Sequence, residues 1–222
     1  VTVGVDLGAS NVRAGAIDAQ HHLETVLRRP VPASRSVEDV VSAIANLVRD
    51  VAGDSTIARA GVGVAAWTEQ PSGAVLVAPN LGWRNVPLRD KLALALGAPV
   101  RVTNDLNAIA WGEFVAGAGR GADNLLCVYV GSGIGGGLVL GGALYEGSSG
   151  LAGEIGHFRT VVEGRLCGCG GRGCLEQYAG GEGIASRVRE DVAGGLKTAL
   201  RAVEAPTAAD VERSATEGDG YA

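Results

Sequence analysis

Three of the four cysteines lie close to a histidine in the second half of the sequence, within Glu154-Ile-Gly-His-Phe-Arg159 and Cys167-Gly-Cys-Gly-Gly-Arg-Gly-Cys-Leu-Glu176. Two thiols separated by one glycine, and a third after glycines that permit tight left-handed turns, can converge on one tetrahedral centre. A disulfide or reduced core cysteines are the alternatives, but a disulfide would leave an odd thiol and require an oxidising compartment. The pattern therefore predicts a closed structural zinc site with the ligands His157, Cys167, Cys169 and Cys174.

A second candidate site is a polar cluster that follows a short predicted strand, Val100 to Thr103. The cluster is Asn104-Asp105-Leu-Asn107, and an apolar helix follows it as far as Val115. Polar side chains that open a helix at the carboxyl end of a strand occupy the usual ligand position of an α/β sheet. The alternative is that Asp105 or Asn107 only caps the helix.

A loop is predicted from Ala78 to Pro87, because it combines prolines, asparagines and a glycine. Asn80 and Trp83 lie in this loop, where both could reach a ligand. An asparagine that caps the loop is the alternative for Asn80.

Two glycine-containing turns each connect a pair of predicted strands. The first turn lies between a strand that ends at Asp6 and a strand from Ala14 to Ile17. The second turn is Gly131-Ser-Gly-Ile-Gly-Gly-Gly137, which follows a predicted buried strand from Leu125 to Val130. The second turn matches G-x-G-x-x-G, but a strand rather than a helix follows, so the dinucleotide-binding fingerprint is excluded. Two similar hairpins indicate an internal duplication.

Backbone amides in such turns can bind an anion, and Asp6 could hold Mg²⁺ through water. A hairpin with small residues is often only a hairpin, and that alternative applies to each turn. The residues predicted to bind the phosphates of a nucleotide or their Mg²⁺ are Asp6, Gly8, Ala9, Ser10, Asn11, Gly131, Ser132, Gly133, Gly135 and Gly136.

The rest of the chain predicts elements that could position these groups. Ser36 to Val51 has a serine cap and apolar helical spacing, and Leu88 to Leu96 predicts a helix that stops at Gly97. Ala60 to Ala66 predicts a buried strand. Alternating strands and helices favour a layered α/β architecture.

Composition excludes several classes of protein. Hydrophobic residues make up 46% and charged residues 19% of 222 residues, and the formal net charge is −5. With no block of lysine or arginine, we expect no nucleic-acid surface in these residues. No apolar run reaches the roughly 18 residues that a membrane span requires, so we expect no membrane association and a cytoplasmic protein.

The chain resembles the ROK family of bacterial sugar kinases and sugar-responsive repressors, and is most similar to its glucokinases. The resemblance covers about residues 1 to 185, and the cysteine segment is its most specific part. Its motifs are Asp6 to Ser10, Pro79-Asn80, Gly82 to Pro87, Asn104 to Asn107, Gly131 to Gly136, Gly153 to His157 and Cys167 to Glu176.

The resemblance implies transfer of the γ-phosphoryl group of ATP, with Mg²⁺, to the 6-hydroxyl of glucose, with Asp105 as the catalytic base. It also implies that Asn80, Asn104, Asp105, Glu154, His157 and Glu176 contact the sugar. Zinc would be structural, because four protein ligands leave no open position for water. Polyphosphate is an alternative donor, and similar proteins are often dimers or tetramers.

The implied fold is actin/hexokinase-like, also called ribonuclease H-like, with two domains and a cleft between them. We expect the domains to be residues 1–117 and 118–222. The sequence contains no methionine, and the family's adenosine-gripping region and C-terminal helix do not appear, so we expect part of the fold to be missing.

The competing function is a sugar-sensing repressor, which would carry a helix-turn-helix ahead of the first strand. The sequence begins at that strand, which favours the kinase. Asp105 also favours the kinase, because a sensor needs no base. Other possible substrates are N-acetylmannosamine, N-acetylglucosamine, fructose and mannose.

Overall fold

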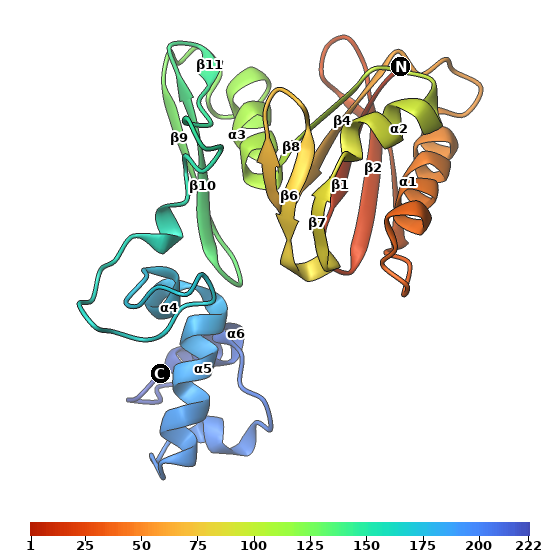
Figure 1. Cartoon of the computed structure of the whole chain (residues 1–222). Helices are drawn as coiled ribbons and strands as arrows, with labels where there is room; N and C mark the ends of the chain where they lie inside the picture. The colour runs from red at the N-terminus through yellow and green to blue at the C-terminus, as the bar shows by residue number, and fades with distance from the viewer. The chain divides into compact units, whose positions relative to one another are not determined.

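A computed structural model describes residues 1–222 (Figure 1). The chain forms two compact units. Unit 1 consists of residues 1–127 and 137–152, and unit 2 of residues 128–136 and 153–222. Each unit therefore consists of two separate stretches of the chain. The sequence predicts two continuous domains, residues 1–117 and 118–222, and these bounds stay a prediction.

Unit 1 contains a five-stranded sheet in the order β3-β2-β1-β4-β8. Its strands are β1 (Thr2–Leu7), β2 (Asn11–Ile17), β3 (Leu23–Pro30), β4 (Arg59–Val64) and β8 (Val100–Asn104). β1 and β2 form the predicted antiparallel hairpin, while β1, β4 and β8 run parallel. The parallel strands bring three carboxyl ends to one edge of the sheet.

Helices α1 (Val37–Ala52) and α2 (Leu88–Leu96) pack together beside this sheet (Figure 1). α1 begins as predicted, because the Ser36 side chain accepts a hydrogen bond from the Asp39 amide. α2 ends as predicted at Gly97, whose φ of 64° suits glycine. Alternate residues of β1, namely Val3, Val5 and Leu7, join the buried face of α1 in the core.

A second sheet of unit 1 has the order β5-β6-β7. It consists of β5 (Trp67–Glu69), β6 (Ala74–Ala78) and β7 (Trp83–Val86). The prediction of a loop from Ala78 to Pro87 is wrong in part, because a 3₁₀ turn (Pro79–Leu81) and β7 occupy it. Trp83 fills the core rather than a ligand pocket, and its indole N–H donates to the Arg35 carbonyl at 2.8 Å.

Helix α3 (Asp105–Val115) follows β8 directly. A third sheet, in the order β11-β10-β9, contains β9 (Leu125–Val130), β10 (Ile134–Leu140) and β11 (Ala143–Leu144). The prediction that Leu125 to Val130 is a buried strand is right about the strand and wrong about its burial. Because β9 is an edge strand, four of its apolar side chains are exposed: Leu126, Val128, Tyr129 and Val130.

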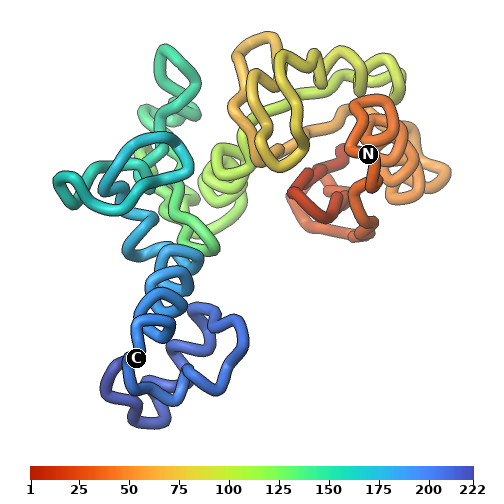
Figure 2. Tube along the Cα trace, turned by 60° about the horizontal axis from the view of Figure 1, so that its bottom comes forward, coloured from red at the N-terminus to blue at the C-terminus, as the bar shows by residue number.

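Unit 2 is mostly turns and helices. It contains a 3₁₀ turn (Ile155–His157), α4 (Glu176–Ala179), α5 (Gly181–Ala193), a 3₁₀ turn (Ala199–Ala202) and α6 (Ala208–Thr216). The trace of α5 and the segment after it can be followed in Figure 2. The mixture of parallel strands and helices confirms the predicted α/β class. Of the helices, none is both long and apolar enough to cross a membrane.

Candidate active site and metal centre

The polar cluster after β8 lies at the carboxyl edge of the parallel strands of unit 1. Strand register aligns Leu7 with Val64 and Val64 with Asn104, so the three strands end side by side. Asp6 therefore lies one residue before the end of β1, and Asp105 opens α3 at the end of β8. This edge is where α/β sheets bind ligands.

Asn104, rather than Asp105 or Asn107, caps α3. Its side-chain oxygen accepts hydrogen bonds from the amides of Leu106 at 2.9 Å and Asn107 at 3.2 Å. Its side-chain nitrogen donates to the Ala66 carbonyl at 3.3 Å. Asn104 thus accepts hydrogen bonds from the first amides of the helix. The alternative that Asp105 or Asn107 serves as the cap is therefore wrong.

The carboxyl of Asp105 is partly buried, and burial raises its pKa above the usual 3.8. The Leu106 amide, which donates to Asp105 Oδ1 at 3.0 Å, acts in the opposite direction. The negative charge of Asp6 raises the pKa of Asp105 further. A carboxylate whose proton affinity is raised in this way is suited to accept a proton.

Gly63 on β4 allows α3 to begin this close to the sheet. A Cβ added at Gly63 would lie 3.1 Å from the Ala108 Cβ and 3.3 Å from the Asp105 Cα. Gly61, two residues earlier on the same face of β4, has no such neighbour within 4 Å. Sequence reasoning missed Gly63, although two glycines alternating within a β-rich segment are a signal of close backbone approach.

Asn80 is exposed in the 3₁₀ turn between β6 and β7. Its carbonyl accepts a hydrogen bond from the Arg35 guanidinium at 2.8 Å, and the same arginine's carbonyl receives the Trp83 indole. These two bonds fix the turn that carries Asn80. The amide side chain of Asn80 has the exposure that contact with a sugar requires, and this role stays a prediction.

The first glycine turn connects β1 and β2 at Gly8 to Ser10. The Gly8 amide donates to the Asn11 carbonyl at 3.0 Å, so this amide closes the turn and is engaged within the chain. Asn11 begins β2. Asp6 is exposed, and its carboxylate lies 3.5 Å from the Arg13 guanidinium. Anion binding by Ala9, Ser10 and Asn11 stays a prediction.

The second glycine turn is shorter than the sequence suggests. Gly131 donates to the Gly133 carbonyl at 2.9 Å, and β10 begins at Ile134. Gly135 and Gly136 consequently lie in a buried part of β10 rather than in the turn. Of the five residues predicted to face phosphate here, the turn itself contains Gly131, Ser132 and Gly133.

The four predicted zinc ligands lie together in unit 2. His157 ends a 3₁₀ turn, and the thiols belong to a small hairpin, residues 159–174, that we call the cysteine hairpin. Bridges between Arg159 and Cys174 and between Leu166 and Arg172 hold it. Gly173 must be glycine, because its φ is 76° and a Cβ would lie 1.7 Å from the Val161 carbonyl oxygen.

The geometry of these ligands fits zinc. All four ligand atoms lie within 4.8 Å of one another, with Cys167 Sγ 3.6 Å from His157 Nδ1 and Cys169 Sγ 3.8 Å from Cys174 Sγ. A tetrahedron with Zn–S bonds of about 2.3 Å and a Zn–N bond of about 2.0 Å has edges of roughly 3.5 to 3.8 Å. All four cysteines of the chain are free thiols, so the structure contains none of the disulfides considered as an alternative.

Proton loss from the thiols is part of metal binding at this centre. Burial raises the pKa of the Cys167 thiol to about 12, so a metal ion must displace a proton there. The Gly171 amide, which donates to Cys169 Sγ at 3.4 Å, lowers the pKa of that thiol. Gln177, which sequence reasoning missed, donates to Cys167 Sγ at 3.7 Å.

Two carboxylates flank the histidine. Glu154 Oε2 lies 3.8 Å from His157 Nε2, and Glu176 Oε1 lies 3.6 Å from His157 Nδ1 and 3.0 Å from Cys167 Sγ. Nδ1 faces the thiols, so Nε2 is the nitrogen that remains for another ligand. Unit 2 therefore brings together the predicted sugar contacts Glu154, His157 and Glu176, while unit 1 brings together Asn104, Asp105 and Asp6.

Comparisons with known proteins show the family of this chain. The model of the ROK family matches residues 2–222. A glucokinase of Streptomyces coelicolor is 40% identical over 184 residues, which are 83% of this chain and 57% of that protein. The chain therefore spans little more than half the length of that relative.

A solved structure gives a similar result. The ROK family glucokinase of Streptomyces griseus, in complex with glucose and AMPPNP, is 35% identical with a TM-score of 0.79, covering 99% of this chain and 72% of that one. A putative xylose repressor of a Caldicellulosiruptor species is 41% identical over 137 residues, or 62% of this chain and 34% of that protein. The fold is thus that of ROK sugar kinases, which confirms the actin/hexokinase-like prediction, and the chain belongs to the ROK family.

Proposed function

We propose that the protein of which these residues form part is a glucokinase that transfers the γ-phosphoryl group of ATP to the 6-hydroxyl of glucose. The observation that carries this proposal is the placement of Asp105. Its partly buried carboxyl, with a raised pKa, opens α3 at the ligand edge of the parallel strands. The identity to named glucokinases supports glucose as the acceptor.

Asp105 acts as the general base. Phosphoryl transfer needs a positioned hydroxyl, charge neutralisation and a carboxylate that receives the hydroxyl proton. The raised pKa of Asp105 favours proton uptake as the 6-hydroxyl oxygen attacks phosphorus. Asn104 holds the first turn of α3 through two amide bonds and thereby fixes the backbone of Asp105.

In unit 2, Glu154, His157 and Glu176 are proposed to bind hydroxyls of the sugar. In unit 1, Asn80 and Asn104 are proposed sugar contacts. Polar groups that a bound sugar covers reject a sugar that lacks a hydroxyl, because the group is then left unpaired. His157, Cys167, Cys169 and Cys174 would hold the proposed zinc ion, which would fix the shape of the cysteine hairpin and supply no chemistry to the reaction. Its ligand His157 then directs Nε2, beside Glu154, towards the sugar.

The two glycine turns, at Gly8 to Ser10 and Gly131 to Gly133, are proposed to contact the phosphates of ATP. Mg²⁺ supplies charge neutralisation on the phosphate oxygens, and Asp6 is the residue that would hold it through water. Arg13, 3.5 Å from Asp6, adds a positive charge at the same end of the hairpin. We place the protein in the cytoplasm, where ATP and glucose are both present, as a homodimer or homotetramer.

A coupled assay of the full-length protein tests this proposal. Glucose, mannose, fructose, N-acetylmannosamine and N-acetylglucosamine are offered with ATP or polyphosphate, and glucose with ATP is expected to give the highest kcat/KM. The same assay on Asp105→Asn identifies background activity. A wild-type protein that phosphorylates none of these sugars contradicts the proposal.

The second candidate function is a sugar-responsive repressor, which the 41% identity to a putative xylose repressor favours. A sensor binds sugar without turning it over. A full-length protein that binds glucose and an operator fragment, but does not consume ATP, supports this candidate instead.

A further inference from the structure

The cysteine hairpin has little regular structure to hold its shape. Within it, the Cys167 amide donates to the Gly171 carbonyl at 2.8 Å, and the Gly173 amide donates to the Arg165 carbonyl at 2.9 Å. Its apolar side chains are largely exposed, with Val162 at 82% and Leu166 at 63%. Because few apolar contacts hold the hairpin, its position depends on polar anchors.

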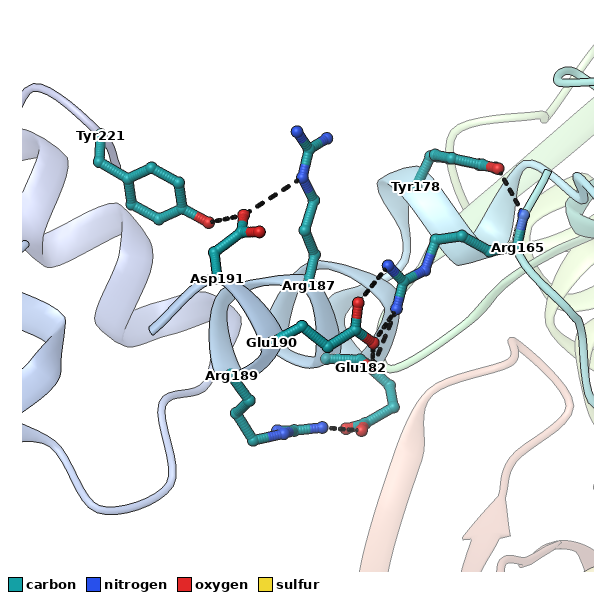
Figure 3. A network of polar contacts seen from close by, with 9 residues as sticks. Arg165, Tyr178, Glu182, Arg187, Arg189, Glu190, Asp191 and Tyr221 are labelled. Atoms are coloured by element: carbon teal, nitrogen blue, oxygen red, sulfur yellow. Dashed lines mark hydrogen bonds and ion pairs between the residues drawn. The ribbon is translucent and has the colours of Figure 1, made fainter. Parts of the chain in front are cut away.

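Arg165, two residues before the first cysteine ligand, is such an anchor (Figure 3). Its guanidinium makes a forked contact with Glu190 on α5, with nitrogen–oxygen distances of 2.8 and 2.5 Å. The same guanidinium donates to Ser186 of α5 at 3.2 Å. Forked arginine–carboxylate pairs fix direction as well as distance.

The main chain of Arg165 is held as well. Its amide donates to the Tyr178 hydroxyl on α4 at 2.8 Å. Gly164 makes this contact possible, since a Cβ there would lie 2.1 Å from the tyrosine hydroxyl. The side chain of Arg165 is thus bonded to α5 and its backbone to α4. The first residue of α4 is Glu176, a proposed sugar contact.

The other ion pairs of α5 in Figure 3 do not reach the hairpin. Glu182 pairs with Arg189, and Arg187 lies 3.7 Å from Asp191, so both pairs lie within the helix itself. Asp191 also accepts a hydrogen bond from the Tyr221 hydroxyl. Among these charges, the pair of Arg165 and Glu190 is therefore the one that ties the cysteine hairpin to α5.

The first turn of α5 contacts the second glycine turn. The amides of Gly181 and Glu182 donate to the carbonyls of Gly131 and Ser132, each at 2.8 Å. Gly180 permits this approach, because a Cβ there would lie 3.2 Å from the Ser132 carbonyl oxygen. One helix thus bonds at its start to the proposed phosphate turn and near its end to the cysteine hairpin.

We propose that Arg165 and Glu190 are positioning residues that lock the cysteine hairpin onto α5, so that the metal ligands, Glu176 and the turn at Gly131 keep one arrangement. The metal and sugar roles in this inference rest on the proposed function. Without the lock, the hairpin opens more readily, so its ligands leave a bound metal ion more easily. Loss of supporting contacts around a metal site typically weakens metal affinity about 10- to 100-fold.

The experiment compares Glu190→Gln with Glu182→Gln in the full-length protein. Both changes remove one carboxylate charge that pairs with an arginine and lies on α5, but only Glu190 contacts the hairpin. Zinc release under excess chelator is followed with a metallochromic dye. Release from Glu190→Gln is expected to be about tenfold faster than release from Glu182→Gln.

Two further readouts separate positioning from general destabilisation. In Glu190→Gln the KM for glucose is expected to rise severalfold while kcat changes less than twofold, because Asp105 is untouched. Amide hydrogen exchange of residues 161–174 is expected to be about tenfold faster in Glu190→Gln than in Glu182→Gln, with equal exchange in α1. Arg165→Met combined with Glu190→Gln should add little to Arg165→Met alone, since that change already removes the ion pair with Glu190.

Equal zinc release and equal hairpin exchange in the two glutamine variants overturn the inference. If the wild-type protein holds no zinc, hairpin exchange alone decides, and the metal proposal fails separately. If the wild-type protein phosphorylates no sugar, exchange and zinc release still decide, and the proposed function fails separately.

Discussion

Gly63 offers a direct test of how closely α3 must approach the sheet. In Gly63→Ala the new methyl group would lie 3.1 Å from the Ala108 Cβ and 3.3 Å from the Asp105 Cα, against the 3.4 Å at which ordinary contact begins. The first turn of α3 must therefore move away by at least about 0.3 Å, taking Asp105 with it. We expect kcat to fall, with a smaller change in the KM for glucose.

The size of the effect follows from that displacement. A misplacement of about 1 Å costs roughly 100-fold in rate, or about 2.7 kcal/mol. A shift of about 0.3 to 0.5 Å then costs about 0.8 to 1.4 kcal/mol, which lowers kcat roughly four- to tenfold. Overpacking costs about 1 to 3 kcal/mol, and replacing glycine returns about 0.5 to 1 kcal/mol, so stability should fall slightly.

Gly61→Ala is the matched control, because it adds the same methyl group to the same face of β4 where nothing lies within 4 Å. Its kcat should equal that of the wild type, and its stability should rise by about 0.5 to 1 kcal/mol. Steady-state kinetics and thermal unfolding of both variants provide the comparison. Equal kcat values for Gly61→Ala and Gly63→Ala would refute the reasoning.

Four further outcomes are expected. Asp105→Asn should lower kcat by about 10²- to 10⁴-fold and leave glucose affinity nearly unchanged, as judged by isothermal calorimetry; normal turnover would remove Asp105 from the mechanism. The pKa of Asp105 is raised in the folded state, so just above pH 3.8 the folded protein binds more protons than the unfolded protein. The stability that Asp105 contributes at low pH is therefore lost as pH rises through its folded-state pKa. Asp105→Asn should consequently be no less stable than the wild type at pH 7, as measured by thermal unfolding. The acidic limb of the kcat profile should move to lower pH in Asp6→Asn, since the charge of Asp6 contributes to the raised pKa of Asp105, and an unmoved limb argues against that coupling. Cys169→Ser, or chelation, should release about one zinc ion per chain and raise the KM for glucose, whereas full activity without metal would contradict a structural zinc site.

Local patterns predicted the elements of unit 1 because they carry their own signals. Ser36 caps α1 and Gly97 ends α2 where turn chemistry places them. The spacing of Cys167, Cys169 and Cys174 likewise predicted four ligand atoms that the structure brings within 4.8 Å, since the glycines between them dictate the turns.

Features that depend on neighbours in space were harder to predict. The burial of β9 depends on how many strands pair with it, and its apolar sequence resembles that of a central strand. Glycine is typical of turns, so the sequence predicts a turn at Gly135 and Gly136, yet both are buried strand residues in β10. The lock between Arg165 and Glu190 joins positions whose separation along the chain carries no periodic signal.

The four thiol and imidazole ligands all come from residues 157 to 174, a short and continuous stretch of chain. Closing a loop of that length costs little conformational entropy, and the cost grows only slowly with length. During synthesis all four side chains therefore emerge, and can bind a metal ion, before α5 is present to hold the hairpin. Metal supply would then act on the earliest folding steps of unit 2, so growth under zinc starvation should lower the yield of folded protein as well as its activity.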